Sequence, residues 1–399
     1  MIHSKNSSKT ILKTIKNYGP LTCKDISKIT NFNIPKVTVL VNNLLFRDLV
    51  EKVETPKKRG RPPKLIQIKS DMSFFIGINI DSENIRIILV DINGTVLNKL
   101  KIKTEPDSGI KNILNNISLK LEELTNVLGI NINKISGIGL STPSAINKKT
   151  GKIIVSSNLG WSNINLKELA ENKFNLPVTI ETSDRAMSYA EKKFGIARSF
   201  SDFFFIEIGA GIGSCIFLNN KLYTSPAGFG GEFGHTTIIE DGEICKCGNR
   251  GCLENIVSGK SLIDQAKVFI NNGSNTIMHR MTYNNIENLN VELICNAANE
   301  GDKIAYKILK DAGTILGNAI SNVLNVLGIN VVIIGGGLSI TGPIFFNSIY
   351  DSIKLRTLSW IGKDLKLLKT SLDKYGAALG AALFEIDDYF ENFLTKEEI

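Results

Sequence analysis

The sequence predicts an α/β protein with a helical N-terminal head and a larger body in which one α/β pattern occurs twice. Three observations support this prediction. Apolar residues recur at helix spacing through 9–50, strand-like runs open the body at Phe74 and again at Phe203, and each opening leads through a turn signal into further strands and helices. The length of 399 residues suits two or three folding units, and 43% hydrophobic with 22% charged residues is typical of a globular protein.

Positive charge is concentrated in the head. Residues 1–70 contain 15 Lys and Arg against 4 Asp and Glu, a net charge of +11, whereas the other 329 residues contain 32 against 35, a net charge of −3. A basic segment with periodic apolar residues indicates a folded module that binds a polyanion, and not a disordered tail.

Three helical patterns and a hairpin account for the head. The helices are expected over 9–18, 22–30 and 33–50, with Asn33 as the N-cap of the third and Pro35 in its first turn. Two short alternating segments, LVEKVE and KLIQIK, flank TPKKRGRPP and predict a two-stranded hairpin. Three helices followed by a hairpin are typical of a winged helix-turn-helix.

A winged helix-turn-helix predicts double-stranded operator DNA as a partner. The third helix of such a head enters the major groove with its N-terminal residues nearest the bases. The expected base-contacting residues are Asn33, Lys36, Val37 and Thr38. The tip of the hairpin holds Lys58, Arg59 and Arg61, which either enter a narrow minor groove or contact only phosphates.

A histidine and three closely spaced cysteines indicate a metal site. His235, Cys245, Cys247 and Cys252 offer one imidazole nitrogen and three thiolates, a set that describes a closed tetrahedral zinc site of structural type. A disulfide would leave one of the three cysteines over, and a chance cluster of buried cysteines is the remaining alternative.

The head and six motifs of the body resemble the ROK family of repressors, open reading frames and sugar kinases. The motifs are STPSAIN, NLGW, GAGIG, GEFGH, CKCGNRGCLE and VVIIGGGL, and the resemblance covers about 9–385. It implies a two-lobed body of the actin/hexokinase-like (ribonuclease H-like) class, and it implies zinc as the metal. The head is similar to that of the repressor branch, which includes xylose, glucose and N-acetylglucosamine repressors.

This resemblance also implies domain limits. The expected winged helix-turn-helix covers 1–70, the first lobe 71–198, and the second lobe 199–375 with the zinc loop and sugar pocket, while 376–399 returns to the first lobe.

Six residues are expected to contact a sugar. The resemblance implies Glu232, His235 and Glu254, and carboxylates suit the paired hydroxyls of a sugar. His235 would use one ring nitrogen for zinc and the other for the sugar. For Glu232 the alternative is a loop-stabilising acceptor, and for Glu254 a surface carboxylate at a helix start. The full expected set is Glu232, His235, Glu254, Asn158, Ser183 and Asp184.

Two departures from the kinase pattern predict that the body is not an enzyme. Kinases of the family open with Asp-x-Gly-Gly-Thr, but this chain has Asn79-Ile80-Asp81-Ser82-Glu83, which places negative charge where phosphates would lie. The position of the catalytic base holds Ser183, a residue too weakly basic to take a sugar proton. Asp184, one residue later, would restore a base only after a local shift. No catalytic residue is therefore expected.

The combined prediction is a transcriptional repressor of sugar-utilisation genes. A sugar effector in a cleft between the lobes would alter the spacing of two heads in a homodimer or tetramer. The protein is expected in the cytoplasm without a membrane span, because Asn residues and a glycine run interrupt the uncharged stretch from Ala312 to Tyr350. The alternatives are a sugar kinase with an added head and a regulator controlled by a protein partner.

Overall fold

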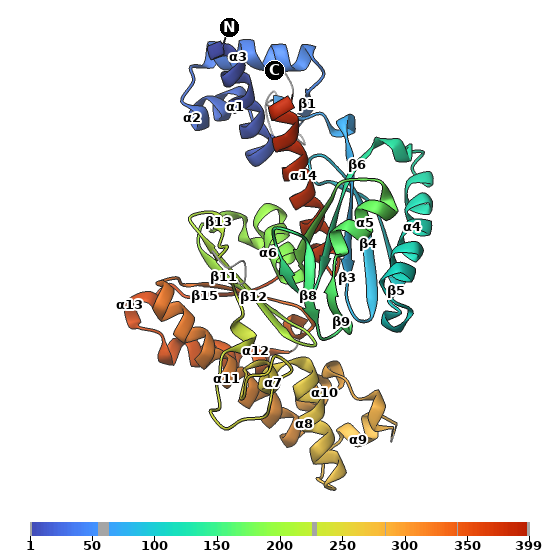
Figure 1. Ribbon diagram of the computed structural model, residues 1–399. Helices are drawn as coiled ribbons and strands as arrows, with labels where there is room; N and C mark the ends of the chain where they lie inside the picture. Colours follow the sequence, from blue (N-terminus) through green and yellow to red (C-terminus); the bar gives the residue numbers. More distant parts are fainter. Residues whose placement is uncertain (1, 55–63, 226–229, 284, 341, 397–399) are drawn as a thin grey trace. The chain divides into compact units, whose positions relative to one another are not determined.

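The computed structural model describes residues 2–54, 64–225, 230–283, 285–340 and 342–396 (Figure 1). The chain divides into two compact units. Unit 1 comprises Met1–Met187 with Tyr375–Ile399, and unit 2 comprises Ser188–Lys374. Each unit is described by itself below.

The head at the start of unit 1 consists of three helices and a hairpin. Its elements are α1 (Ile2–Tyr18), α2 (Cys23–Thr30), α3 (Ile34–Phe46), β1 (Val50–Glu54) and β2 (Lys64–Ile68). Thr22 and Asp25 form a capping box at α2, and the Asn33 side chain caps α3 by accepting from the Lys36 amide. The two strands pair antiparallel, so the winged helix-turn-helix arrangement is confirmed.

The first α/β half follows in the same unit. Its elements are β3 (Phe74–Ile80), β4 (Asn84–Asp91), β5 (Val96–Lys103), α4 (Ile110–Asn126), β6 (Ile135–Thr142), β7 (Ala145–Asn147), β8 (Lys152–Ser156), β9 (Trp161–Ile164), α5 (Leu166–Phe174), β10 (Val178–Thr182), α6 (Ser183–Phe194) and α14 (Gly376–Lys396). The main sheet has the order β10-β6-β3-β4-β5, and β7-β8-β9 form a small antiparallel sheet. Since α6 runs past Met187, its last residues belong to unit 2.

Helix α14 packs closely on this sheet because glycines replace side chains at the contact. A Cβ placed on Gly139 would stand 1.9 Å from the carbonyl oxygen of Ala381, and one on Gly77 would stand 2.1 Å from that of Ala378. Side chains alternate along a strand, so the isoleucines of β3 point to the opposite face, where they join the core formed with α4 and α5.

One carboxyl group is buried beneath α14. Glu385 is 3% exposed and accepts a hydrogen bond from the Thr179 hydroxyl of β10. The absence of a side chain at Gly137 makes room for it, because a Cβ there would lie 2.2 Å from a Glu385 oxygen. Burial first of all, and in addition the nearby Asp388, raises the pKa of Glu385 to about 7.

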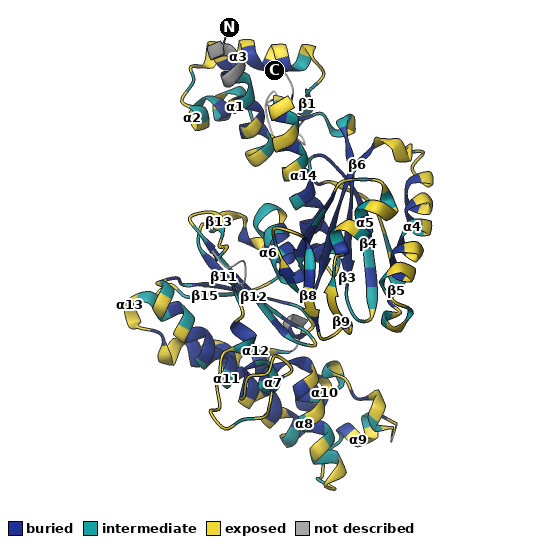
Figure 2. Cartoon of the chain, viewed as in Figure 1, coloured by how far each residue is buried: buried dark blue, intermediate teal, exposed yellow. Residues whose placement is uncertain are grey.

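The outer part of α14 contacts the head. Figure 2 shows the helix changing from buried residues near the sheet to more exposed residues near its end. Three lysines along α1 meet three acceptors along α14: Lys16 meets Asp387, Lys13 meets Glu391 at 2.7 Å, and Lys9 meets the carbonyl of Leu394. Three lysines of the head are therefore engaged in contacts within unit 1.

Unit 2 repeats the strand arrangement of the first half. Its elements are β11 (Phe203–Ile208), β12 (Ile212–Leu218), β13 (Lys221–Leu222), α7 (Glu254–Val257), α8 (Gly259–Asn271), α9 (Met278–Met281), α10 (Val291–Asn299), α11 (Lys303–Leu327), β14 (Val331–Gly335), α12 (Pro343–Arg356), α13 (Ser359–Gly362) and β15 (Lys366–Lys369). The order β13-β12-β11-β14-β15 has antiparallel pairs on one side of β11 and parallel pairs on the other. The sheet of unit 1 has the same pattern about β3.

The duplicated sheet confirms the predicted fold class of a winged helix-turn-helix followed by a two-lobed, ribonuclease H-like body. Within the described ranges, no helix is both long enough and apolar enough to cross a bilayer.

Candidate metal centre and ligand-binding residues

The histidine and the three cysteines lie on one irregular loop of unit 2. His235 ends a single 3-10 turn, Phe233–His235, and the chain returns through a bridge between Thr237 and Cys252. Gly251 has φ +62°, and a Cβ there would stand 1.6 Å from the Ile239 carbonyl oxygen, so a larger residue would open the loop.

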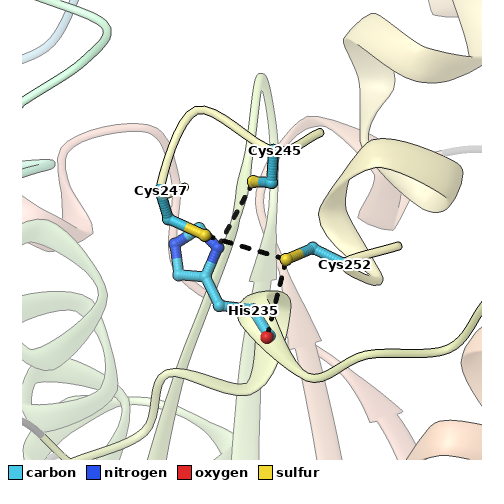
Figure 3. Close-up of side chains that lie close together, drawn as sticks. All are labelled: His235, Cys245, Cys247 and Cys252. Atoms are coloured by element: carbon cyan, nitrogen blue, oxygen red, sulfur yellow. Dashed lines mark hydrogen bonds between the residues drawn. The ribbon is translucent and has the colours of Figure 1, made fainter. Parts of the chain in front are cut away.

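The four side chains point toward one centre (Figure 3). Their candidate ligand atoms all lie within 4.8 Å of one another. Cys245 Sγ is 3.7 Å from His235 Nδ1, and Cys247 Sγ is 3.7 Å from Cys252 Sγ. None of the six cysteines forms a disulfide in the structure.

This donor set fits a tetrahedral metal ion. Thiolates bound at about 2.3 Å to one zinc stand roughly 3.7 Å apart, which is the separation found here between Cys247 and Cys252. Burial and then the neighbouring Cys247 and Cys245 raise the pKa of Cys252 to about 12, and a bound cation would offset this effect by favouring the Cys252 thiolate. The cluster can hold a metal, and the structure brings together all four residues that the sequence predicts.

The two glutamates beside this loop have different environments. Glu254 begins α7, and its Oε2 accepts a 2.8 Å hydrogen bond from the amide of Ile212, the first residue of β12 after the glycine-rich turn. A side chain at Gly211 would collide with this carboxylate, 2.4 Å away. Glu232 immediately precedes the turn that ends in His235 and is exposed. Glu254 is therefore held at the turn and is not a loose surface carboxylate.

Ser183, at the base position of the kinase pattern, belongs to a buried hydrogen-bond network in unit 1. Its Oγ donates to Asn79 Oδ1 at 2.7 Å, and Ser141 Oγ donates to the same oxygen at 2.9 Å. The single hydroxyl proton of Ser183 is therefore engaged. The remaining lone pairs can accept from a ligand hydroxyl, but a serine hydroxyl is too weak a base to remove its proton.

Asp81 occupies the turn that the resemblance to the kinases matches to their phosphate-binding motif. Its Oδ1 accepts from the amides of Glu83 and Asn84, both at 2.9 Å, and its other oxygen pairs with Arg86. Backbone amides of such a turn are the groups that would otherwise hold a phosphate. The turn therefore contains its own anion.

Asn158 and Asp184 complete the sugar-contact set expected from the sequence. Asn158 is exposed between β8 and β9, whereas Trp161 beside it is 5% exposed and belongs to the core of unit 1. Asp184 is half-buried in the first turn of α6. The preceding Glu181 is buried and pairs with Lys148 and with Arg185, which holds the start of the helix.

The predicted DNA contacts of α3 require one correction. Val37 is 0% exposed, because it belongs to the same stripe as Leu40, Val41 and Leu44, so its side chain cannot reach a base. Asn33, Lys36 and Thr38 are exposed, although Asn33 also caps the helix. Lys58, Arg59 and Arg61 at the hairpin tip lie outside the described residues.

Comparison with known proteins decides the family. The sequence pattern of the ROK family matches residues 75–387. This chain belongs to the ROK family. A relative, the xylose repressor of Caldicellulosiruptor bescii, is 30% identical over 383 residues, which cover 95% of this chain and 94% of that protein.

Solved structures from this family include both regulators and kinases. A ROK family transcriptional regulator, described as a homologue of the Escherichia coli MLC protein, is 26% identical, covers 98% of each chain and superposes with a TM-score of 0.79. A ROK family glucokinase from Streptomyces griseus, in complex with glucose and AMPPNP, is 25% identical with a TM-score of 0.69. It covers 78% of this chain and 98% of its own.

Sequence reasoning missed two features of these regions. The outward face of α3 carries Val39, Asn42 and Phe46, and it follows from the same helical period that places Val37 inside. The other missed feature is that Asp81 accepts hydrogen bonds from the backbone amides of its own turn. In the sequence its only sign is an acidic residue where the kinases have glycine.

Proposed function

We propose that this ROK protein is a DNA-binding repressor of sugar-utilisation genes whose body binds a sugar without phosphorylating it. The observation that carries the proposal is the hydrogen bond from Ser183 to Asn79, in a chain that also has a basic winged helix-turn-helix. Relatives named as xylose repressors and a transcriptional regulator of similar fold support it. Such a regulator acts in the cytoplasm, on double-stranded operator DNA.

The proposed sugar contacts are Glu232, His235, Glu254, Asn158, Ser183 and Asp184. They are tested by substitutions that remove a charge or a hydrogen-bonding group while keeping the size of the side chain. In Glu254→Gln the amide oxygen still accepts from Ile212, so the fold is kept while the charge is lost. Charged hydrogen bonds contribute about 1.5–3 kcal/mol, so we expect sugar affinity to fall at least tenfold. Thermal-shift titration with pentoses, hexoses and amino sugars measures it, and an unchanged affinity in this variant would remove Glu254 from the site.

The regulatory part is tested with operator DNA. We propose a homodimer in which the sugar acts as inducer and releases the DNA, because two heads need a fixed separation to meet two half-sites. The assay is fluorescence anisotropy of labelled operator with and without the sugar found by thermal shift. An operator affinity that no sugar changes would refute sugar control and favour a protein partner. Sedimentation velocity measures the dimer.

We further propose that the metal is zinc and that its role is structural. All four donors belong to the chain, and a tetrahedral site that uses all of them leaves no position for a substrate. Zinc bound through His235 Nδ1 would orient the ring so that its other nitrogen meets the sugar. Metal analysis of the purified protein is the direct test, with about one zinc per chain expected.

A sugar kinase with a DNA-binding head is the competing function. The glycine-rich turn between β11 and β12 persists in this chain, and one structural relative is a glucokinase bound to AMPPNP. A coupled ADP-release assay over the same sugars separates the two functions. We expect no sugar-dependent turnover above the background rate of ATP hydrolysis, and a sugar-dependent rate would establish the kinase.

A further inference from the structure

The outward face of α3 exposes apolar side chains that the fold does not use. Helix α3 turns its core stripe inward with a period of 3.6 residues, so Pro35, Val39, Asn42 and Phe46 lie on the opposite face. Val39 is 62% exposed and Phe46 is 92% exposed. Exposed apolar residues aligned on one helix face indicate a surface that is covered by a partner.

The charge of the head identifies DNA as the partner. Residues 1–70 carry a net charge of +11, and among the side chains that the structure describes α14 engages Lys9, Lys13 and Lys16 of α1. Lysine is depleted in protein–protein interfaces, so an apolar face surrounded by many lysines argues against a protein partner. A polyanion that offers apolar groups between its charges matches both features, and the major groove of DNA offers the methyl groups of thymine.

The side chains of this face suit A·T base pairs. Asparagine can bond to N6 and N7 of adenine in a bidentate manner, and apolar side chains contact the thymine methyl. Recognition of guanine usually needs Arg or Lys, but α3 contains no Arg, and its single lysine, Lys36, lies over the Phe32 ring at 4.0 Å. Val39 and Phe46 are seven residues apart, a rise of about 10.5 Å along the helix, which is about three base steps of about 3.4 Å each.

We propose that α3 reads consecutive A·T base pairs in the major groove, with Val39 and Phe46 against thymine methyls and Asn42 on adenine. The proposal rests on the DNA-binding function proposed above. It differs from the sequence-based expectation, because the reading residues lie along the outward face of the helix and extend to its last turn.

The test begins with the full-length protein and a randomised duplex library. Selection should enrich half-sites that contain runs of A·T pairs. Deoxyuridine then replaces single thymines to remove the methyl, and 7-deazaadenine replaces single adenines to remove N7. Anisotropy should show a severalfold loss for wild type at the positions read by Val39 and Phe46, and about a tenfold loss at the adenine read by Asn42.

Variants assign each contact. Val39→Ala should bind more weakly and should no longer respond to deoxyuridine at the thymine that Val39 contacts. Phe46→Ala should behave in the same way at the thymine that Phe46 contacts. Asn42→Ala should lose the discrimination against 7-deazaadenine. Leu119→Ala is the matched control, since Leu119 is 70% exposed on α4 in the body, and it should behave as wild type.

Three outcomes would overturn the inference. One is wild-type binding that ignores both base analogues, and another is a set of variants with unchanged base preference. The third is a change of the oligomer mass in Val39→Ala or Phe46→Ala without DNA, which would assign the face to a protein contact. If wild type binds no duplex at all, the proposed DNA-binding function fails together with the inference, and this result is distinguishable from the other three.

Discussion

Replacing Glu385 by glutamine should make the stability of unit 1 less dependent on pH. The carboxyl is buried between α14 and the sheet, where it accepts from Thr179, and its pKa is raised from 4.5 to about 7 by burial and by Asp388. Glutamine has nearly the same shape and keeps an acceptor for the threonine, but it cannot ionise.

Proton linkage gives the sign and the size of this pH dependence. Between pH 4.5 and about 7 the folded state holds a proton on Glu385 that the unfolded chain has lost, so stability falls as the pH rises through this window. The contribution is fully present below pH 4.5 and is lost above about pH 7. Two and a half pKa units at about 1.4 kcal/mol each amount to about 3.5 kcal/mol. Glu385→Gln should match wild type at pH 4.5 and exceed its stability by up to about 3.5 kcal/mol at pH 8.

The assay uses the tryptophans of the chain. Trp161 is buried in unit 1, and Trp360 is 75% exposed in unit 2, so a Trp360→Phe background confines the fluorescence signal to unit 1. Urea unfolding is then measured from pH 4.5 to 8. Glu391→Gln, on the same helix but exposed, is the control and should keep the wild-type pH dependence. The reasoning is refuted if Glu385→Gln shows the same pH dependence as wild type.

Three further predictions concern the metal loop, the head and the sheet. Cys252→Ser should lose the bound metal and lower the melting temperature, as measured by elemental analysis and calorimetry; metal retained at full occupancy would contradict the four-ligand site. Asp387→Asn should destabilise the head by about 2 kcal/mol, because Lys16 is only 10% exposed, and a double-mutant cycle with Lys16→Met should show a coupling energy clearly above zero. Gly139→Ala should lower the free energy of unfolding by at least about 2 kcal/mol or prevent folding, because its Cβ would collide with the backbone of α14. Gly337→Ala has open space around its Cβ and should be tolerated. Equal stability of these two variants would show that α14 packs less closely on the sheet.

Local patterns predicted most of the head and the metal loop. Asn33 is a cap whose effect extends over three residues, and the spacing from His235 to Cys252 describes a loop that must fold on itself. Such features depend on neighbours in the chain and can be read directly. The prediction of Val37 as a DNA contact was wrong, because the helical period places its side chain in the buried stripe with Leu40 and Val41.

Contacts between distant parts of the chain could not be predicted in the same way. The bond between Asn79 and Ser183 joins residues that are 104 positions apart, and Lys16 meets Asp387 across 371 positions. No period or cap specifies such a pair before the fold is known. The resemblance predicted that two kinase residues are replaced, and the structure shows that the residues at these positions, Asn79 and Ser183, are hydrogen-bonded to each other.

The turn at Asp81 and the network at Ser183 have a consequence for the evolution of the protein. The carboxylate of Asp81 holds the amides of its turn, and Asn79 holds the hydroxyl of Ser183. Under the proposed function, a glycine at position 81 would free the turn without supplying a base, and an aspartate at position 183 would face Asn79 with the turn still closed. On that proposal, a gain of phosphoryl transfer would need at least two substitutions together, one in the turn and one at position 183. The proposed function therefore implies that substitutions in the effector site would change which sugar is bound without restoring its phosphorylation.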